Sequence, residues 1–320
     1  MLDIIITGPV SDFVEKKLSD FGRIVVLDDI TENSILNYSK NAVAIVCRGE
    51  AVITRNIIEA APYLRVIGRT GVGVDSIDIP AATEKGIPVI NTPGANSLSV
   101  AEGALTLTLM MLKEILHWNT QVHSGNWASR YKMITRDIQD SSLGIVGFGN
   151  IGRKLTTLAL PLGLNVLATD PFVSSQEANK LGVELLELEE LLAKSDVVTL
   201  HTTLTDETRG IINNKTIKLM KQGAFLINLG RGGLIADLDI LYEALKSEHL
   251  RAVALNTFEP EPPDLNHPIF GHERCVCSPH VIGLTPAAMN NIYSSMTEDM
   301  VKILTNKLPK FCVNSETLNH

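Results

Sequence analysis

The stretch LGIVGFGNIG, residues 143–152, decides the fold. Residues that favour β-strands lead directly into the glycine pattern GxGxxG, and a helical pattern follows over residues 153–160. Gly147 would allow a tight turn from strand to helix, Gly149 would let a pyrophosphate approach the backbone, and Gly152 would let the helix pack closely on the strand. The phosphates would then lie at the N-terminus of that helix. The stretch therefore predicts the first unit of a dinucleotide-binding domain.

A second predicted strand, residues 165–169, ends at Asp170. A carboxylate at this point can accept hydrogen bonds from both ribose hydroxyls and would repel a 2′-phosphate, which favours NAD over NADP. An Asp before Pro171 is also a common turn former. Its place behind the glycine turn favours the cofactor-binding interpretation.

The bulk composition limits the class of protein. A chain of 320 residues favours two domains over one. The formal net charge of -8 argues against a nucleic-acid partner, because a phosphate backbone needs a basic surface. Residues 104–112, the most apolar stretch, are too few to span a membrane, and the N-terminus lacks the basic leader of a signal peptide. We expect a cytoplasmic protein without a membrane or nucleic-acid partner.

The cysteines agree with a reducing compartment. Cys47, Cys275, Cys277 and Cys312 show no spacing typical of a disulfide framework. Cys275 and Cys277 are two residues apart in a predicted strand, so they face the same way. We interpret them as small packing residues rather than a metal or redox pair.

Strand and helix patterns alternate along the whole chain. The first predicted strands cover residues 2–7, 24–27, 43–47, 65–68 and 87–90. Short βα units of this kind imply a parallel, doubly wound sheet. A long apolar helix is then predicted from Ser99 to about Trp118, with Ser99 and Glu102 at capping-box spacing. Residues 125–140, which include Trp127, predict an arm that docks on a partner subunit.

A second series of six strands follows the arm. They are predicted at residues 143–146, 165–169, 196–201, 224–228, 252–256 and 275–277. We expect the last helix, residues 286–304, to return to the first domain, and no further regulatory domain after residue 320. The prediction is an α/β fold with two doubly wound parallel-sheet domains. A Rossmann NAD-binding domain (98–286) is inserted in a flavodoxin-like substrate domain (1–97 and 287–320).

Three segments that directly follow strands of the second domain carry reactive side chains. Arg231 lies in a glycine loop, where its guanidinium is suited to a bidentate grip on a carboxylate. Glu261 stands between two prolines, and His280 follows a proline. Each residue taken alone is more often structural than catalytic. Together, at the carboxyl ends of strands in one nucleotide-binding sheet, they predict a catalytic site.

The three side chains match the needs of hydride transfer from a 2-hydroxy acid. Arg231 would hold the substrate carboxylate and polarise the C2 oxygen. His280 would take the hydroxyl proton as the hydride leaves for the nicotinamide, and return it in the reverse direction. Glu261 would orient His280 and favour its imidazolium form.

On these motifs the chain resembles the D-isomer-specific 2-hydroxyacid dehydrogenase family, from about residue 44 to the C-terminus. The resemblance implies catalytic roles for Arg231, Glu261 and His280. It implies cofactor contacts at Gly147, Gly149, Asn150, Ile151, Gly152, Asp170, Thr202, Gly230 and Asn256. Asn256 stands where the family usually has Asp. Its oxygen can still accept a hydrogen bond, but without the negative charge we expect a weaker relative preference for NAD⁺ over NADH.

The resemblance also suggests substrate contacts. Residues 69–75 resemble a family loop whose backbone amides hold the substrate carboxylate, which points to Val72 and Gly73. Arg48 and Asn96 resemble residues that meet the substrate's phosphate and hydroxyl in the phosphoglycerate dehydrogenases of the family. This favours 3-phosphoglycerate and 3-phosphohydroxypyruvate as substrates. Gly49 replaces a Ser of that pocket, so glyoxylate, hydroxypyruvate and D-lactate stay open.

A second class of function stays open as well. Corepressors that resemble this family use the same fold to sense NAD without catalysis, and they keep similar residues. The absence of long disordered flanks favours the enzyme. We expect no metal, and a homodimer built from the helix at residues 104–112 and the arm around Trp127.

Overall fold

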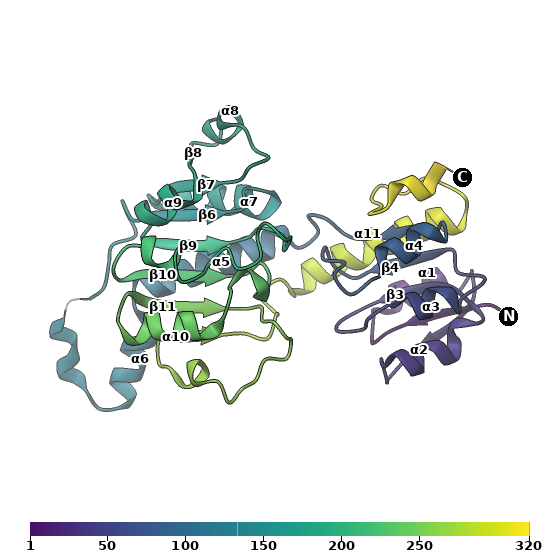
Figure 1. The fold of residues 1–320 in the computed structure, drawn as a ribbon, viewed down its shortest axis with the longest axis horizontal. Helices are drawn as coiled ribbons and strands as arrows, with labels where there is room; N and C mark the ends of the chain where they lie inside the picture. Colours follow the sequence, from purple (N-terminus) through teal and green to yellow (C-terminus); the bar gives the residue numbers. More distant parts are fainter. Residues whose placement is uncertain (133, 320) are drawn as a thin grey trace. The chain divides into compact units, whose positions relative to one another are not determined.

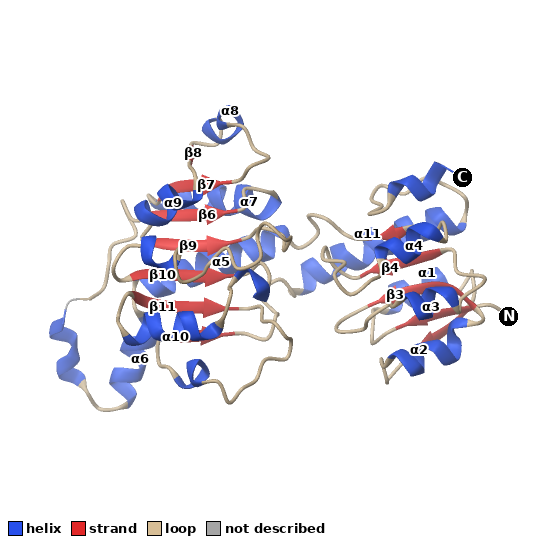
Figure 2. Cartoon of the chain, in the orientation of Figure 1, coloured by secondary structure: helices blue, strands red, loops and turns tan. Residues whose placement is uncertain are grey.

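The computed structural model describes residues 1–132 and 134–319. The chain forms two compact units, which we call unit 1 (Met1–Asn96 with Leu284–His320) and unit 2 (Ser97–Gly283). Each unit is a parallel β-sheet with helices on both faces (Figures 1 and 2). This confirms the predicted α/β fold with two parallel sheets. The chain passes between the units after Asn96 and again after Gly283, whereas the predicted boundaries follow residues 97 and 286.

Unit 1 is built on a five-stranded parallel sheet in the order β2-β1-β3-β4-β5. Its strands are β1 (Asp3–Ile6), β2 (Arg23–Val26), β3 (Ala42–Cys47), β4 (Val66–Arg69) and β5 (Val89–Ile90). The middle strand β3 is buried along its whole length, as expected of a parallel strand covered on both faces. The strand order reverses between β1 and β3. A topological switch point, where doubly wound sheets bind ligands, therefore lies at the carboxyl ends of these two strands.

Two layers of helices cover this sheet. The helices of unit 1 are α1 (Asp12–Leu18), α2 (Glu32–Ser39), α3 (Arg55–Glu59), α4 (Ile79–Glu84) and α11 (Pro286–Leu304). Ile4 and Ile6 pack with α1 and α11, and Ile5 packs with the helices of the other face. A Cβ on Gly68 of β4 would lie 2.2 Å from Met300 Sδ. That glycine lets α11 lie close on the sheet, so the C-terminal helix completes the core of unit 1.

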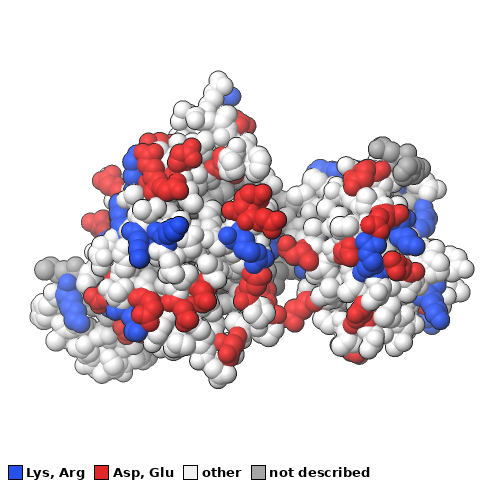
Figure 3. Space-filling view, in the orientation of Figure 1, with Lys and Arg blue, Asp and Glu red and all other residues white. Residues whose placement is uncertain are grey.

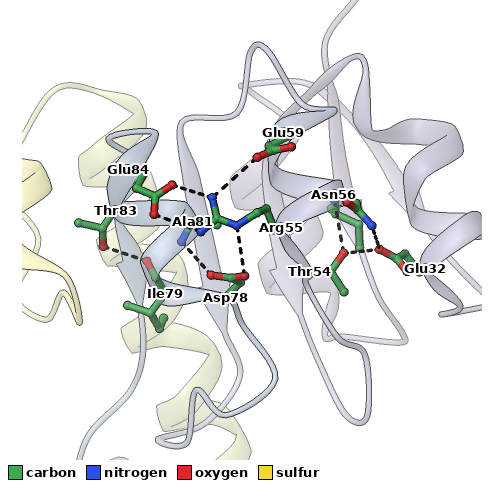
Figure 4. A network of polar contacts seen from close by, with 11 residues as sticks. Glu32, Thr54, Arg55, Asn56, Glu59, Asp78, Ile79, Ala81, Thr83 and Glu84 are labelled. Carbon is green, nitrogen blue, oxygen red and sulfur yellow. Dashed lines mark hydrogen bonds and ion pairs between the residues drawn. The ribbon is translucent and has the colours of Figure 1, made fainter.

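Polar contacts join the helices on the other face (Figure 4). Arg55, the first residue of α3, donates to both carboxylate oxygens of Glu84 in α4, at 2.6 and 3.1 Å. Asp78 caps α4 by accepting from the Ala81 N–H at 2.8 Å. Thr54 occupies the N-cap of α3 and accepts from the Ile57 N–H. Exposed pairs of this kind add little stability each, so the network aligns helix ends while the core holds the unit together.

Unit 2 is built on a seven-stranded parallel sheet in the order β12-β11-β10-β9-β6-β7-β8. Its strands are β6 (Ser142–Val146), β7 (Asn165–Thr169), β8 (Glu184–Leu185), β9 (Val197–Leu200), β10 (Ala224–Asn228), β11 (Leu250–Leu255) and β12 (Cys275–Cys277). The six predicted strands are present. The short strand β8 was not predicted, because its two residues are too few to show a period. The order reverses between β6 and β9, the switch point of the dinucleotide-binding fold.

Helices cover both faces of this sheet. They are α5 (Ser97–Leu112), α6 (Ile115–His123), α7 (Asn150–Ala159), α8 (Ser175–Asn179), α9 (Leu188–Lys194) and α10 (Leu238–Lys246). Alternation along the strands divides the core in two. Phe225 and Ile227 pack with α5 and α7, whereas Leu226 between them packs with α9 and α10.

The single helix predicted from Ser99 to about Trp118 is wrong. The structure has two helices, α5 and α6, and α5 begins at Ser97, before the predicted capping box. Glu114 separates them in the left-handed region, with φ 51°. Its buried carboxylate forms an ion pair with Arg251 at the point where the backbone leaves the helical path. Beyond the break, α6 and the 3₁₀ helix Trp127–Lys132 extend away from the sheet (Figure 1).

The face drawn in Figure 3 carries charged side chains of both signs. On the face drawn in Figure 3, acidic side chains alternate with basic ones, and the blue residues form only small groups. Among the described residues, no helix combines the length and the apolar character needed to cross a lipid bilayer.

Candidate active site

The glycine turn connects β6 to α7 at the switch point of unit 2. Gly147 has φ 93°, and a Cβ on it would lie 2.6 Å from the Thr202 nitrogen, so conformation and space both require glycine. A Cβ on Gly152 would lie 2.7 Å from the Gly147 carbonyl oxygen. A Cβ on Gly149, in contrast, would meet nothing within 4 Å. Two glycines thus serve packing, and the third faces open space that a pyrophosphate can enter.

The first turn of α7 supplies hydrogen-bond donors to that open space. Asn150 and Ile151 are its first two residues, and N–H groups in a first turn have no acceptor within their helix. The positive end of the helix dipole adds to the attraction for phosphate.

Asp170 follows β7 and faces the glycine turn. Its Oδ2 accepts from the Phe148 N–H at 2.8 Å, and its Oδ1 accepts from the Phe172 N–H at 2.9 Å. The residue is therefore a turn former, as the alternative interpretation required, and it also holds the glycine turn. A carboxylate has about four lone-pair positions. Two remain for the hydroxyls of a ribose.

The carboxyl ends of β9 and β10 meet under the glycine turn. A Cβ on Gly230 would lie 3.0 Å from the Thr202 carbonyl oxygen, and the Gly230 N–H donates to Asn228 Oδ1 at 3.1 Å. His201 Nε2 lies 2.9 Å from Thr199 Oγ1, while its buried Nδ1 has no partner among the described residues. Burial lowers the pKa of His201 to about 3. The ring is therefore neutral, and it packs without adding charge beside the cofactor region.

Glycines also place the Arg231 loop. A Cβ on Gly232 would lie 2.0 Å from the carbonyl carbon of Phe258. Only glycine therefore lets the loop after β10 lie against the loop after β11. Asn228 Nδ2 donates to the Arg231 carbonyl oxygen at 2.9 Å and holds the start of the loop. Gly232 therefore brings these two loops together.

Glu261 and His280 form a direct pair. His280 Nδ1 lies 2.9 Å from Glu261 Oε2 and 3.2 Å from Oε1. Because a carboxylate only accepts, Nδ1 carries the hydrogen, and Nε2 of the neutral ring is left with its lone pair. Glu261 Oε1 also accepts from the Phe258 N–H at 2.9 Å, which fixes the carboxylate. His280 is half exposed, so its Nε2 can meet a substrate and act as a general base or acid.

Asn256 organises the loop that carries His280. Its buried Oδ1 accepts from Ser278 Oγ at 2.8 Å, from the Val281 N–H at 3.0 Å and from the Ile282 N–H at 3.3 Å. Its backbone oxygen accepts from the His280 N–H at 2.9 Å. The side-chain oxygen, which the sequence analysis assigned to the cofactor, is therefore occupied by the protein. Over residues 1–132 and 134–319, the Nδ2 group has no hydrogen bond of its own, and it is the part of Asn256 left for a cofactor.

One further residue of the site was missed from sequence. Gly103, inside α5, lies so near the His280 loop that a Cβ on it would be 2.1 Å from Ile282 Cγ2. A glycine inside an otherwise apolar helix is the signal that would have found it, because such glycines often mark a close approach.

The predicted substrate residues lie in unit 1. Arg48 directly follows β3, and Val72 and Gly73 follow β4, at the carboxyl edge of the five-stranded sheet. The Arg48 N–H donates to Thr7 Oγ1 at 2.8 Å, and its guanidinium donates to the Pro9 carbonyl oxygen, across the switch point between β1 and β3. Asn91 Nδ2 donates to the Val72 carbonyl oxygen at 2.8 Å. Asn96 is the last residue of unit 1 before the chain enters α5.

A cluster with ligand-like geometry lies elsewhere in unit 2. Asp237, Asp239 and His267 bring ligand atoms within 4.8 Å of one another. His267 Nδ1 accepts from the Ile269 N–H at 3.2 Å, so Nε2 carries the hydrogen that Asp239 accepts at 3.1 Å. The cluster is thus already satisfied as a pair of helix caps.

These features define a nucleotide-binding unit with a Glu–His pair at the carboxyl edge of its sheet. Residues 105–281 match the family described as D-isomer specific 2-hydroxyacid dehydrogenase, NAD binding domain. The chain therefore belongs to the D-isomer specific 2-hydroxyacid dehydrogenase family, as predicted. This is a family of oxidoreductases that act on CH–OH donors with NAD, and unit 2 is the NAD-binding domain.

Individual relatives differ in name and length. The chain is 39% identical over 316 residues to a D-3-phosphoglycerate dehydrogenase of Methanocaldococcus jannaschii, which covers 98% of this chain and 60% of that protein. It is 34% identical to a hydroxypyruvate reductase of Thermotoga maritima over 88% of this chain and 90% of that protein. A D-lactate dehydrogenase structure from Aquifex aeolicus, complexed with NAD and lactic acid, has a TM-score of 0.85 at 26% identity, with 95% of each chain covered. The chain spans about 60% of the phosphoglycerate dehydrogenase that it matches.

Proposed function

We propose that this protein is an NAD-dependent oxidoreductase that interconverts a small D-2-hydroxy acid and its 2-oxo acid. The observation that carries the proposal is the His280–Glu261 pair, in which Nδ1 is held at 2.9 Å and Nε2 is left as the proton acceptor. The nicotinamide of the bound cofactor supplies or accepts the hydride. Gly147, Gly149, Asn150, Ile151, Gly152, Asp170, Thr202, Gly230 and Asn256 would hold that cofactor.

The chain's own residues would perform the proton transfer and the orientation of substrate. In the oxidation direction, His280 Nε2 would take the proton of the C2 hydroxyl, and Glu261 would stabilise the resulting imidazolium across the Nδ1 hydrogen bond. Arg231 would bind the carboxylate and polarise the C2 oxygen, which gains negative charge as the proton leaves. Reduction runs through the same groups in reverse.

We propose 3-phosphoglycerate and 3-phosphohydroxypyruvate as the substrate pair. The M. jannaschii relative is named a D-3-phosphoglycerate dehydrogenase. Arg48, at the switch point of unit 1, is a cation suited to binding a phosphate. Val72, Gly73 and Asn96 would complete the substrate contacts. The T. maritima relative supports hydroxypyruvate reduction as the second candidate.

The assembly is part of the same proposal. Leu116, Val122, Trp127 and Tyr131 are exposed on α6 and the 3₁₀ helix that follows it, and exposed apolar side chains on one projecting segment favour a protein interface. We propose a cytoplasmic homodimer formed through this arm. A monomeric mass by light scattering at micromolar concentration would reject the dimer.

The test is oxidation of NADH by the purified protein with a panel of 2-oxo acids. Turnover of 3-phosphohydroxypyruvate that falls on Arg48→Ala, with hydroxypyruvate turnover unchanged in that variant, would establish the phosphorylated substrate. Turnover of hydroxypyruvate, glyoxylate or pyruvate alone would move the assignment to a general 2-oxo-acid reductase. NADH binding without turnover of any acid would reject catalysis in favour of NAD sensing.

A further inference from the structure

Two thiols lie side by side on the outermost strand of unit 2. β12 ends the seven-stranded sheet and pairs only with β11. Cys275 and Cys277 project from the same face of β12, and their sulfur atoms are 3.5 Å apart. Val276 between them packs with the core on the α5 face, whereas Cys275 packs with the core on the α10 face. The pair therefore lies on the opposite face of the sheet from α5.

The two thiols differ in exposure and acidity. Cys277 is exposed and Cys275 is partly buried. The hydrogen bond from Cys275 lowers the pKa of the Cys277 thiol, and the same contact, together with burial, raises the pKa of Cys275. Cys277 is thus the more acidic and more accessible thiol of the pair. For the other two cysteines, Cys47 and Cys312, burial raises the pKa. An accessible thiol with a lowered pKa, 3.5 Å from a second thiol, is the arrangement of oxidant-sensitive cysteines.

We propose that Cys275 and Cys277 are an oxidisable dithiol, which peroxides convert to a disulfide, and that this disulfide displaces the His280 loop. This assignment reverses the interpretation from sequence, which saw two packing residues. The geometry favours oxidation over metal binding. A zinc site needs three or four protein ligands, and within the described part of the chain the one cluster with ligand geometry does not include these cysteines.

The chemistry balances with hydrogen peroxide as oxidant. The Cys277 thiolate attacks one peroxide oxygen, an S–O bond forms as the O–O bond breaks, and hydroxide leaves. The Cys275 sulfur then attacks the sulfenic sulfur of Cys277. The S–S bond forms as the S–O bond breaks, and the departing oxygen leaves as water with the proton of the Cys275 thiol. The two sulfur atoms lose two electrons, which the peroxide gains.

Closing the disulfide would strain β12 and favour a bend in it. Its sulfur atoms must approach from 3.5 Å to about 2.05 Å. In an extended strand, Cα atoms two residues apart are separated by roughly 6.6 Å, near the upper limit for a disulfide. An edge strand can bend because one side is unpaired. The resulting strain makes the bond easy to reduce, which suits a reversible switch.

The bend would act directly on the loop that carries His280. Cys277 pairs with Leu255, and the Ser278 N–H donates to the Leu255 carbonyl oxygen at 3.0 Å. Ser278 Oγ in turn donates to Asn256, which holds the His280 loop. Shortening the strand at Cys277 pulls on these contacts and moves His280 from its place beside Glu261. The loss of activity rests on the proposed function, whereas formation of the disulfide does not.

The test treats the purified protein with one equivalent of hydrogen peroxide. Intact-mass analysis should show a loss of about 2 Da, the mass of two hydrogen atoms, which dithiothreitol restores. Peptide mapping should place the bond at Cys275 and Cys277. Cys312→Ser is the matched control and should behave as the natural chain does. Cys275→Ser should stop at a sulfenic acid on Cys277 that dimedone traps. No loss of mass in the natural chain, or oxidation at Cys47 or Cys312 instead, would overturn the dithiol.

Two readouts test the link to His280. Amide hydrogen exchange of residues 278–283 should quicken on oxidation, and kcat should fall by on the order of tenfold or more and recover with dithiothreitol. The double variant Cys275→Ser/Cys277→Ser should resist both changes. A disulfide that forms without faster exchange would overturn the coupling. A protein that shows the mass and exchange changes but has no activity even when reduced would support the switch and reject the proposed function.

Discussion

The sharpest prediction concerns Asn256, because its buried Oδ1 accepts hydrogen bonds from three groups of the His280 loop. In Asn256→Ala, the Val281 and Ile282 N–H groups lose their side-chain acceptor, as does the Ser278 hydroxyl. Each buried donor left unsatisfied costs about 1–3 kcal/mol. The two N–H groups alone would therefore cost about 2–6 kcal/mol if the loop kept its position.

The loop can avoid most of that cost by moving, because Val281 and His280 are partly exposed. Moving releases the N–H groups to water and takes His280 away from Glu261. A displacement of about 1 Å in a catalytic group lowers the rate on the order of 100-fold. We therefore expect Asn256→Ala to lose kcat on that scale, with a smaller effect on Tm, because the released N–H groups regain water as hydrogen-bond partners.

Asn256→Asp is the matched control, since a carboxylate oxygen can accept from the same N–H groups. It should keep kcat within about threefold of the natural chain, and its negative charge should raise the affinity for NAD⁺ relative to NADH. The measurements are steady-state kinetics, Tm and the two cofactor dissociation constants. Full kcat in Asn256→Ala would refute the role in positioning His280. Unchanged dissociation constants in Asn256→Asp would refute the charge argument.

Three further predictions concern the same unit. Burial lowers the pKa of His201 to about 3, so the unfolded chain binds a proton below pH ~6.5 that the folded chain excludes. The contribution of His201 to the free energy of unfolding is complete above that pH and falls by roughly 2 kcal/mol at pH ~5. Urea unfolding of His201→Gln should not show that loss. An equal loss in the natural chain and in the variant would contradict the burial argument. Gly232→Ala should lower the free energy of unfolding by at least about 1–3 kcal/mol, because its Cβ meets the Phe258 carbonyl carbon at 2.0 Å. Gly149→Ala, whose Cβ meets nothing within 4 Å, should unfold as the natural chain does yet bind NADH more weakly. Calorimetry and binding that show a destabilised Gly149→Ala, or a Gly232→Ala with unchanged stability, would refute the roles given to these glycines.

Much of this protein could be predicted from local patterns, because the forces behind them act between neighbours in sequence. The glycine turn is such a case: the positive φ of Gly147 and the helix that follows it are demands of a few consecutive residues. The six longer strands of unit 2 show their apolar runs directly. Arg231, Glu261 and His280 were predicted because each lies in a loop that follows a strand, and parallel strands bring their carboxyl ends to one edge; the structure places His280 Nδ1 2.9 Å from Glu261 Oε2.

Contacts between distant residues decided the rest, since a sequence pattern carries no record of what lies opposite a side chain. The predicted long helix breaks at Glu114, whose buried carboxylate pairs with Arg251, 137 residues away. Asn256 turns its oxygen to the His280 loop because two backbone N–H groups there need an acceptor. Gly103 and Gly232 are required by Ile282 and Phe258, which the fold alone brings near them. Cys275 and Cys277 share a face by simple alternation, but the 3.5 Å between their sulfur atoms and the exposure of Cys277 depend on side-chain packing that only the tertiary structure shows.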